Sequence, residues 1–235
     1  RLLELEVEDV YRVGRVEGGT WDSFTRISSM AFGDDGRLHL LDPQQRRVHV
    51  VSPEGAHLVS FGTQGDGPGE LRSPVGVQVL ADGRIAVADN GHQAFLLFTP
   101  SGEFIRSYRY GPGSALPGAR LFRQGTDALV AHGQGFRLEA SPGGGPPALP
   151  TTTPVRRWAL DPATDEVEVT LLAEAWRPER EQRPGQTMVG GRAMVAMAAP
   201  RALEPQVHFA PLPDGRFALG DSSAYRIRVY GPDGV

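Results

Sequence analysis

The sequence contains no cysteine, which excludes disulfide bonds and thiolate chemistry. It also lacks any run of about 18 apolar residues, so we expect no transmembrane segment. The formal net charge is -4 and nothing is strongly basic, so we expect no nucleic-acid partner. What remains is a chain of 235 residues, 40% of them hydrophobic, which is enough for one domain with a buried core.

Glycine and proline are abundant instead. The 30 glycines and 20 prolines predict many turns rather than long helices. The stretch FGTQGDGPGEL, residues 61–71, matches neither GxxxxGK[ST] nor GxGxxG, the spacings that cradle phosphates. Asp66 and Glu70 in this stretch would also repel a phosphate. We therefore interpret these glycines as a connection between structural units.

The chain repeats itself. DGRLHLLD, DGRIAVAD and DGRFALGD begin at Asp35, Asp82 and Asp214, and each ends on an aspartate. The first two copies lie 47 residues apart, and a degenerate copy, GTDALVAH, begins at Gly125. Each unit consists of apolar stretches separated by Asp-Gly and Pro-x-Gly turns, which predicts four short strands. Four strands in roughly 40 to 45 residues are typical of a propeller blade.

The stretch GDGPGELRSPVGVQVLADGRIAVADNGHQAFLLFTPSGEF and its copies resemble the NHL-type six-bladed β-propellers of bacterial extracytoplasmic proteins. The resemblance covers the first, second and last units well and the third poorly. It implies an all-β fold of four-stranded antiparallel blades. It also implies a location outside the cytoplasm, whether periplasmic, secreted or lipid-anchored. It implies no particular activity, because such propellers include lyases, lactonase relatives and pure interaction modules.

We expect a single propeller domain over 1–235 with about four blades. Its predicted parts are an outer strand over 2–14, blades over 24–62 and 71–110, a degenerate blade over 118–175 with a loop insertion over 133–154, a second insertion over 176–200, and a blade over 203–235. Two interpretations are open. The favoured one is a fragment of a six-bladed chain; the other is a four-bladed ring closed by the N-terminal strand. The first residue, Arg1, precedes the first methionine, so we expect a processed or cut chain whose signal segment is missing.

Both insertions are predicted in connections that gather at one end of the blades, where strands B and C and successive blades are joined. Long loops on a rigid scaffold commonly carry recognition. We therefore expect this loop-rich face to bind a protein, peptide or glycan, without catalysis and without a cofactor. The candidate residues on it are Trp21, Asp42, Asp89, His92, His132, Arg192, His208 and Asp221.

Several candidates also have structural interpretations. The closing aspartates Asp42, Asp89 and Asp221 suit caps for the amide groups of the loop between strands B and C; the alternative is a Ca²⁺ site. Trp21 suits either an anchor for a partner or packing between blades.

The alternative function is a lactonase- or lyase-like enzyme with Ca²⁺ or Zn²⁺ in the central channel. His208, at the start of an inner strand, would be its weak metal-ligand or base candidate. Lactonase relatives hold their metal with Glu, Asn and Asp side chains, whereas the matching strand starts here offer Ser29, Gly76 and His208. HxH, HExxH and GxSxG motifs are all absent from the sequence.

Overall fold

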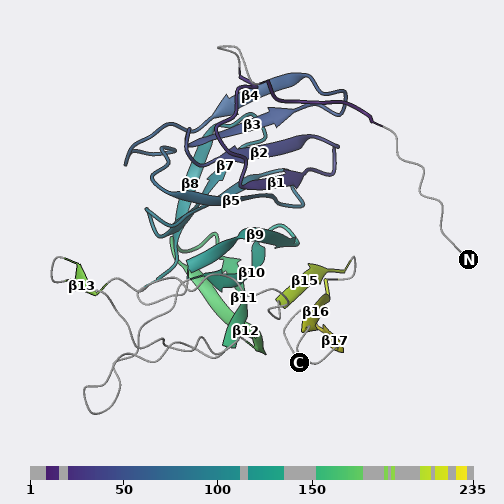
Figure 1. The fold of residues 1–235 in the computed structure, drawn as a ribbon, viewed down its shortest axis with the longest axis vertical. Coiled ribbons are helices and arrows are strands. Elements are labelled where there is room, and N and C mark those ends of the chain that lie inside the picture. The colour runs from purple at the N-terminus through teal and green to yellow at the C-terminus, as the bar shows by residue number, and fades with distance from the viewer. Residues whose placement is uncertain are drawn as a thin grey trace, which may run out of the picture. The chain divides into compact units, whose positions relative to one another are not determined.

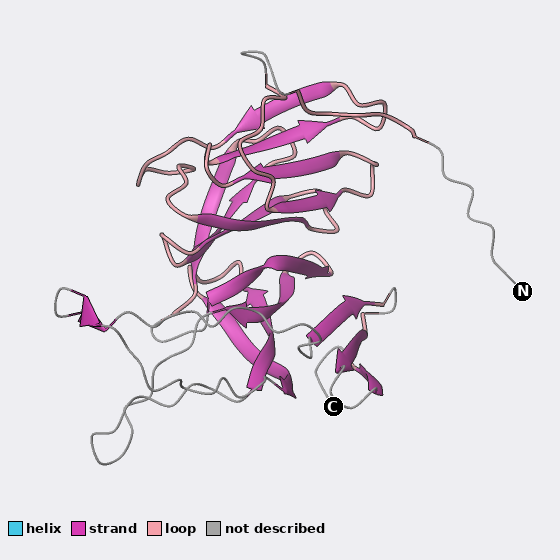
Figure 2. Ribbon diagram, in the orientation of Figure 1, coloured by secondary structure: helices cyan, strands magenta, loops and turns pink. Residues whose placement is uncertain are grey.

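The described residues form strands and connections only. The computed structural model describes residues 9–15, 21–111, 116–134, 152–176, 188–189, 192–193, 207–212, 215–221 and 226–231. No helix occurs in this part of the chain, so none there could span a membrane (Figure 2). The predicted all-β fold of antiparallel sheets is confirmed. The chain divides into two compact units, Arg1–Gly135 with Val155–Leu171 and Phe136–Pro154 with Leu172–Val235.

The first blade contains β1 (Ser29–Phe32), β2 (Leu38–Asp42), β3 (Arg47–Val51) and β4 (His57–Phe61), paired in chain order (Figure 1). Its Asp-Gly turn closes where the Gly33 amide donates to the Arg37 carbonyl at 2.9 Å. Gly36 in that turn has a φ of 78°, which a glycine adopts without a Cβ clash. The Pro-x-Gly turn between β3 and β4 closes from the Ser52 amide to the Ala56 carbonyl at 2.7 Å.

The second blade repeats this design. It contains β5 (Pro74–Val79), β6 (Ile85–Asp89), β7 (Ala94–Phe98) and β8 (Phe104–Arg109). Leu80 and Arg84 close its Asp-Gly turn, and Thr99 and Glu103 close its Pro-x-Gly turn, each by an amide-to-carbonyl bond of 2.8 Å. The sequence repeat is therefore a repeat of backbone hydrogen bonds.

The third blade contains β9 (Leu116–Gln124), β10 (Ala128–Gln134), β11 (Thr152–Leu160) and β12 (Val167–Trp176). Pro162 lies in the turn between β11 and β12, where the repeat predicts the counterpart of Pro100. Of the predicted insertions, 135–151 and 177–187 lie outside the described residues, and β13 (Met188–Val189) pairs with β14 (Arg192–Ala193).

The last sheet contains β15 (Val207–Pro211), β16 (Phe217–Asp221) and β17 (Arg226–Tyr230) in chain order. These three antiparallel strands lie within the blade predicted over 203–235. One face of this sheet is buried around Phe217 and Tyr230, whose rings stack with centroids 5.0 Å apart.

The core of the first unit lies between neighbouring blades. Leu71, at the end of the glycine-rich connection, is fully buried between the first two blades, where burial of a leucine contributes about 2 kcal/mol. The rings of Phe61 and Phe98 meet there with centroids 4.7 Å apart. Between the second and third blades, Phe95 packs edge-on against Trp158, which is fully buried.

The outer strand predicted over 2–14 is absent from its described part. Residues 9–15 have no strand conformation. Tyr11 and Val13 instead pack their side chains against Leu38, Leu40 and Val51 of the first blade. The alternation of apolar residues that suggested a strand is satisfied by this packing alone, without a backbone ladder. Residues 2–8 lie outside the described part, and closure of a ring stays a prediction.

Candidate binding surface at the loop end of the blades

Asp42 ends β2 at the predicted loop end and is fully buried. One carboxylate oxygen accepts hydrogen bonds from the amides of Gln44 and Gln45 at 3.0 and 3.1 Å. The other accepts from the amides of Thr25 and Arg26 at 2.6 and 3.1 Å. The first pair confirms the predicted loop cap. The second pair shows that the same carboxylate also anchors the segment that enters the blade.

Asp89 does the same in the second blade. Its carboxylate accepts from the amides of Arg72 and Ser73 at 2.7 and 2.9 Å and from those of Gly91 and His92 at 2.8 and 3.1 Å. The aspartates are 47 residues apart, and so are all four donor positions. Asp42 and Asp89 therefore each join a loop of their blade to the segment that enters it.

The amide cradle determines the chemistry of Asp42. Burial alone would raise the pKa of this carboxyl, but the hydrogen bonds from the four amides outweigh it and lower the pKa below its usual value. A carboxylate with four amide donors has little capacity left for a cation. In the described residues, no group of three or more His, Asp or Glu could hold a metal ion. The calcium interpretation thus does not fit Asp42 and Asp89.

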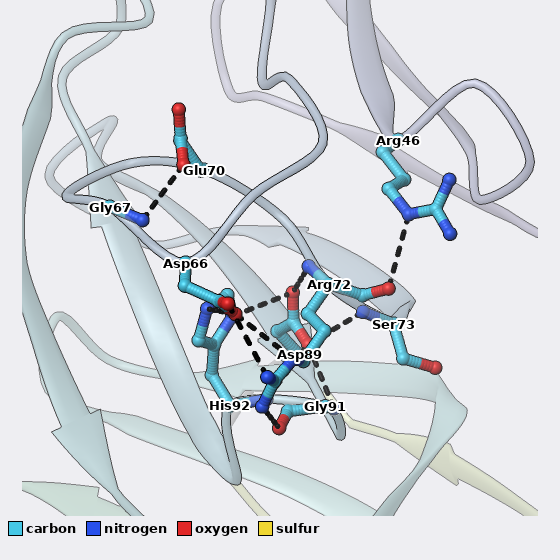
Figure 3. Close-up of polar contacts among 9 residues, drawn as sticks. All are labelled: Arg46, Asp66, Gly67, Glu70, Arg72, Ser73, Asp89, Gly91 and His92. Carbon is cyan, nitrogen blue, oxygen red and sulfur yellow. Dashed lines mark hydrogen bonds and ion pairs between the residues drawn. The ribbon is translucent and has the colours of Figure 1, made fainter.

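A polar network lies beside Asp89 (Figure 3). Nε of Arg72 lies 2.9 Å from Oδ1 of Asp66, a residue of the glycine-rich crossover. The His92 imidazole lies between two carboxylates: Nδ1 is 3.2 Å from Oδ2 of Asp89, and Nε2 is 3.6 Å from Oδ1 of Asp66. The side chains of Asp66 and Arg72 are 69% and 57% exposed, so solvent and a partner can reach them, whereas both ring nitrogens of His92 are buried beneath.

The glycine-rich crossover is shaped by its own side chains. Glu70 accepts a hydrogen bond from the Gly67 amide at 2.8 Å. Arg46, from the loop of the first blade, donates to the Arg72 carbonyl and to Oε1 of Gln64, both at 3.1 Å. The crossover is therefore held as a connection between blades, as expected, and it presents Asp66 to the loop end.

His92 occupies a position that differs between the blades. Its counterpart 47 residues earlier is Gln45. Gln45 donates to the Ser23 carbonyl at 2.7 Å and to the Thr25 hydroxyl at 3.3 Å. The second blade thus has an imidazole ring beside Arg72 and Asp66 in place of the Gln45 hydrogen bonds.

The inner strands lie side by side, β1 against β5 and β5 against β9. Ser29 of β1 and Gly76 of β5 are used in packing these strands together and are not arranged to bind a metal ion. The Ser29 hydroxyl accepts from the Val77 amide at 3.1 Å and donates to the Ala119 carbonyl at 3.0 Å. A Cβ on Gly76 would lie only 2.9 Å from that carbonyl oxygen. Both positions predicted at the channel mouth therefore serve close packing.

Other candidates lie elsewhere. Trp21 stacks on His57 with ring centroids 4.5 Å apart and packs onto the outer face of the first blade. His132 is partly buried on β10, and burial together with the charge of Arg120 lowers its pKa. His208 is exposed on β15. Arg192 lies on β14 and Asp221 ends β16; their side chains lie outside the described residues.

Sequence reasoning thus identified Asp89 and His92, which the structure brings together, but it missed their neighbours Arg72 and Asp66. A signal was present. Arg72 is the counterpart of Thr25 at the repeat offset, so it is a charge that the shared architecture does not require.

The chain forms successive four-stranded antiparallel sheets whose inner strands lie next to one another. This arrangement is that of blades in a β-propeller. No family model matches the sequence. The E3 ubiquitin-protein ligase TRIM71 of Rattus norvegicus is 44% identical over 50 residues, which are 21% of this chain and 6% of that protein.

Among solved structures, a member of the DUF4221 family from Bacteroides vulgatus matches 92% of this chain and 60% of its own with a TM-score of 0.53 and 16% identity. A virginiamycin B lyase from Staphylococcus aureus matches 90% of this chain and 57% of its own with a TM-score of 0.47 and 12% identity. The chain therefore spans less than two thirds of either structure. At these identities the likeness concerns the fold alone.

Proposed function

We propose that this protein is a non-enzymatic binding propeller that presents the loop end of its blades to a protein, peptide or glycan partner. One observation carries the proposal. The carboxylates that repeat at this end, Asp42 and Asp89, are buried, and their hydrogen-bonding capacity is occupied by backbone amides. The side chains that differ between blades, Arg72 and His92, are at least partly exposed, and both contact the carboxylate of Asp66.

A constant scaffold with a variable surface is the arrangement of a recognition module. The metal-dependent lactonase or lyase alternative has less support. The Ser29 hydroxyl is occupied by two backbone groups, and Gly76 has no side chain and no room for one. These two positions of the first unit thus supply no ligand for a catalytic metal.

The proposal includes an NHL-type six-bladed parent protein located outside the cytoplasm. Its support is the resemblance of the repeats in residues 65–104 and their copies. The complete reading frame tests both parts. Six repeat units behind a signal peptide or lipobox are expected, and a four-unit frame without either would contradict them.

The binding function can be tested with the purified full chain on peptide and glycan arrays. The double variant Arg72→Thr/His92→Gln carries the residues that the first blade has at these positions. Arg37→Ser, at the opposite end of the first blade, is the control. Ligands that are lost only in the double variant support the proposal.

Elemental analysis of the same preparation tests the alternative. An equimolar, tightly held Ca²⁺ or Zn²⁺ whose removal abolishes turnover of a lactone or ester would overturn the non-enzymatic proposal.

A further inference from the structure

Charge is separated along the strands of the first two blades. At the loop end, residues 23–111 contribute five arginines: Arg26, Arg46, Arg47, Arg72 and Arg109. Apart from the buried Asp42 and Asp89, the carboxylates that this range contributes at this end are Asp66 and Glu70. Arg109 also lies against Asp165 and Glu166 of the third blade, and its amide donates to the Asp165 carbonyl at 2.7 Å. The loop end of these blades is therefore cationic, although the whole chain has a net charge of -4.

The opposite end of the same blades is acidic. Its turns contain five exposed carboxylates, those of Asp34, Asp35, Glu54, Asp82 and Glu103. The arginines in these turns are Arg37 and Arg84, each paired with the aspartate two residues before it, and Asp34 pairs with Arg123 of β9. Glu54 and Glu103 form no ion pair with the residues that the structure describes. An anionic partner is thus attracted to the loop end and repelled from the turn end.

The loop-end arginines are not part of the repeated architecture. When the two repeat copies are aligned at the 47-residue offset, every one of these arginines corresponds to an uncharged residue. The counterparts, in the order of the arginines, are Ser73, Gln93, Ala94, Thr25 and Gly62. The fold therefore accepts neutral residues at these positions. Arg46 holds the crossover, and the other four cations need another explanation.

The choice of cation is also informative. All 24 basic residues counted as Lys or Arg are arginine, so the chain contains no lysine. Guanidinium groups bind carboxylates through paired hydrogen bonds. Arg72 already shows this geometry with Asp66, with Nε 2.9 Å from Oδ1 and Nη2 3.4 Å from Oδ2. The loop end thus holds an aspartate side chain of its own.

Two of the five arginines, Arg26 and Arg47, are available for a partner. Both are exposed, and neither forms an ion pair with the residues that the structure describes. Arg26 and Arg47 both lie next to Asp42. The backbone amide of Arg26 donates a hydrogen bond to the Asp42 carboxylate, and Arg47 is the residue of β3 that pairs with Asp42 of β2. They belong to one surface.

We propose that the loop end of the first two blades binds an acidic polypeptide segment. Its aspartate or glutamate side chains pair with Arg26 and Arg47, and one of them replaces Asp66 at Arg72. This inference rests on the proposed binding function and names the chemistry of the partner.

The experiment is a fluorescence-anisotropy titration of the full chain with a labelled peptide of alternating glutamate and serine. The test variant is Arg26→Ser/Arg47→Ala, which introduces the second blade's residues. Arg12→Ser/Arg37→Ser removes the same charge from two exposed arginines away from the loop end. The test variant should weaken binding about tenfold and the control less than about twofold.

A further variant, Asp66→Asn, should tighten peptide binding by about twofold or more, because it frees Arg72 and His92. Three results would each overturn the inference: no binding by the unmodified chain, equal weakening in both double variants, or tighter binding of a single-stranded oligonucleotide of equal charge. Array ligands that depend on Arg72 and His92 but lack acidic groups would also overturn it, while leaving the proposed binding function intact.

Discussion

The Ser29 hydroxyl accepts a hydrogen bond from the Val77 amide at 3.1 Å, although the two residues are 48 positions apart. With the Ala119 carbonyl as its acceptor at 3.0 Å, the same hydroxyl connects the inner strands of three blades. Sheets usually satisfy their edges by pairing, but inner strands of neighbouring blades do not pair with one another. A single side chain therefore serves where backbone pairing is missing.

Ser29→Ala should lower the free energy of unfolding by about 1 to 3 kcal/mol, because it leaves the Val77 amide buried without an acceptor. Urea denaturation measures the change. Ser101→Ala, in an exposed turn where the hydroxyl contacts only Thr99, is the control and should change it by less than about 0.5 kcal/mol. Equal effects of the two variants would show that Ser29 does not connect the blades.

Gly76→Ala should also destabilise the first unit, by about 1 to 3 kcal/mol. The added Cβ would lie 2.9 Å from the Ala119 carbonyl oxygen and 3.0 Å from the Leu121 side chain, and the backbone atom cannot rotate away. At Gly220 in β16 the nearest atom would be 3.7 Å away, an ordinary contact, so Gly220→Ala should be close to neutral. Thermal denaturation compares the two. A neutral Gly76→Ala would mean that β5 and β9 can separate without loss.

Much of this fold could be predicted from the repeat. Asp35, Gly36 and Arg37 recur as Asp82, Gly83 and Arg84, and the turn that they form depends only on neighbouring residues. The bridge from Ser29 could not be predicted in this way. Its partners are on other blades, and nothing near Ser29 in the sequence specifies them.

The candidate site divides along the same line. The loop cap by Asp42 is local and was predicted, whereas its bonds to Thr25 and Arg26 require a crossover 16 to 17 residues away to fold back. The strand predicted over 2–14 shows the converse error. Alternating apolar residues such as Tyr11 and Val13 specify a face to be covered, but they do not specify the backbone that covers it.

Asp42 should make stability depend on pH in the acid range. Its pKa is lowered in the folded protein, so its contribution is present above the unfolded value near 3.8 and is lost as the pH falls through the folded value. Asp42→Asn should remove this part of the pH dependence. At neutral pH it should cost about 2 kcal/mol or more, because the amide cannot accept four hydrogen bonds.

Urea denaturation at a series of pH values, with the unmodified chain in parallel, measures both effects. Asp35→Asn, in an exposed turn, is the control and should preserve the acid loss of stability. An unmodified chain with no loss of stability below pH 3.8 would contradict the cradle at Asp42.

Histidine burial should produce a second, separate loss of stability on acidification, and this one begins at a higher pH than the loss from Asp42. Burial lowers the pKa of His39 and of His49, and the charges of His57 and Arg47 add to the effect at His49, against the opposing charge of Asp42. A histidine with a lowered folded pKa binds protons more readily when unfolded. Its neutral form thus favours folding above about pH 6.5, and this contribution declines as the pH falls below that value.

His49 allows this step to be isolated. It is 2% exposed, and its Nδ1 lies 2.8 Å from the Ser60 hydroxyl, which also contacts Nε2 of His57. His49→Gln keeps a polar partner for Ser60 but cannot be protonated, so it should flatten the stability profile between about pH 5 and 6.5. His208→Gln, on an exposed ring, should leave the profile unchanged. If His49→Gln keeps the full slope between about pH 5 and 6.5, the loss of stability in this range does not belong to the His49 imidazole.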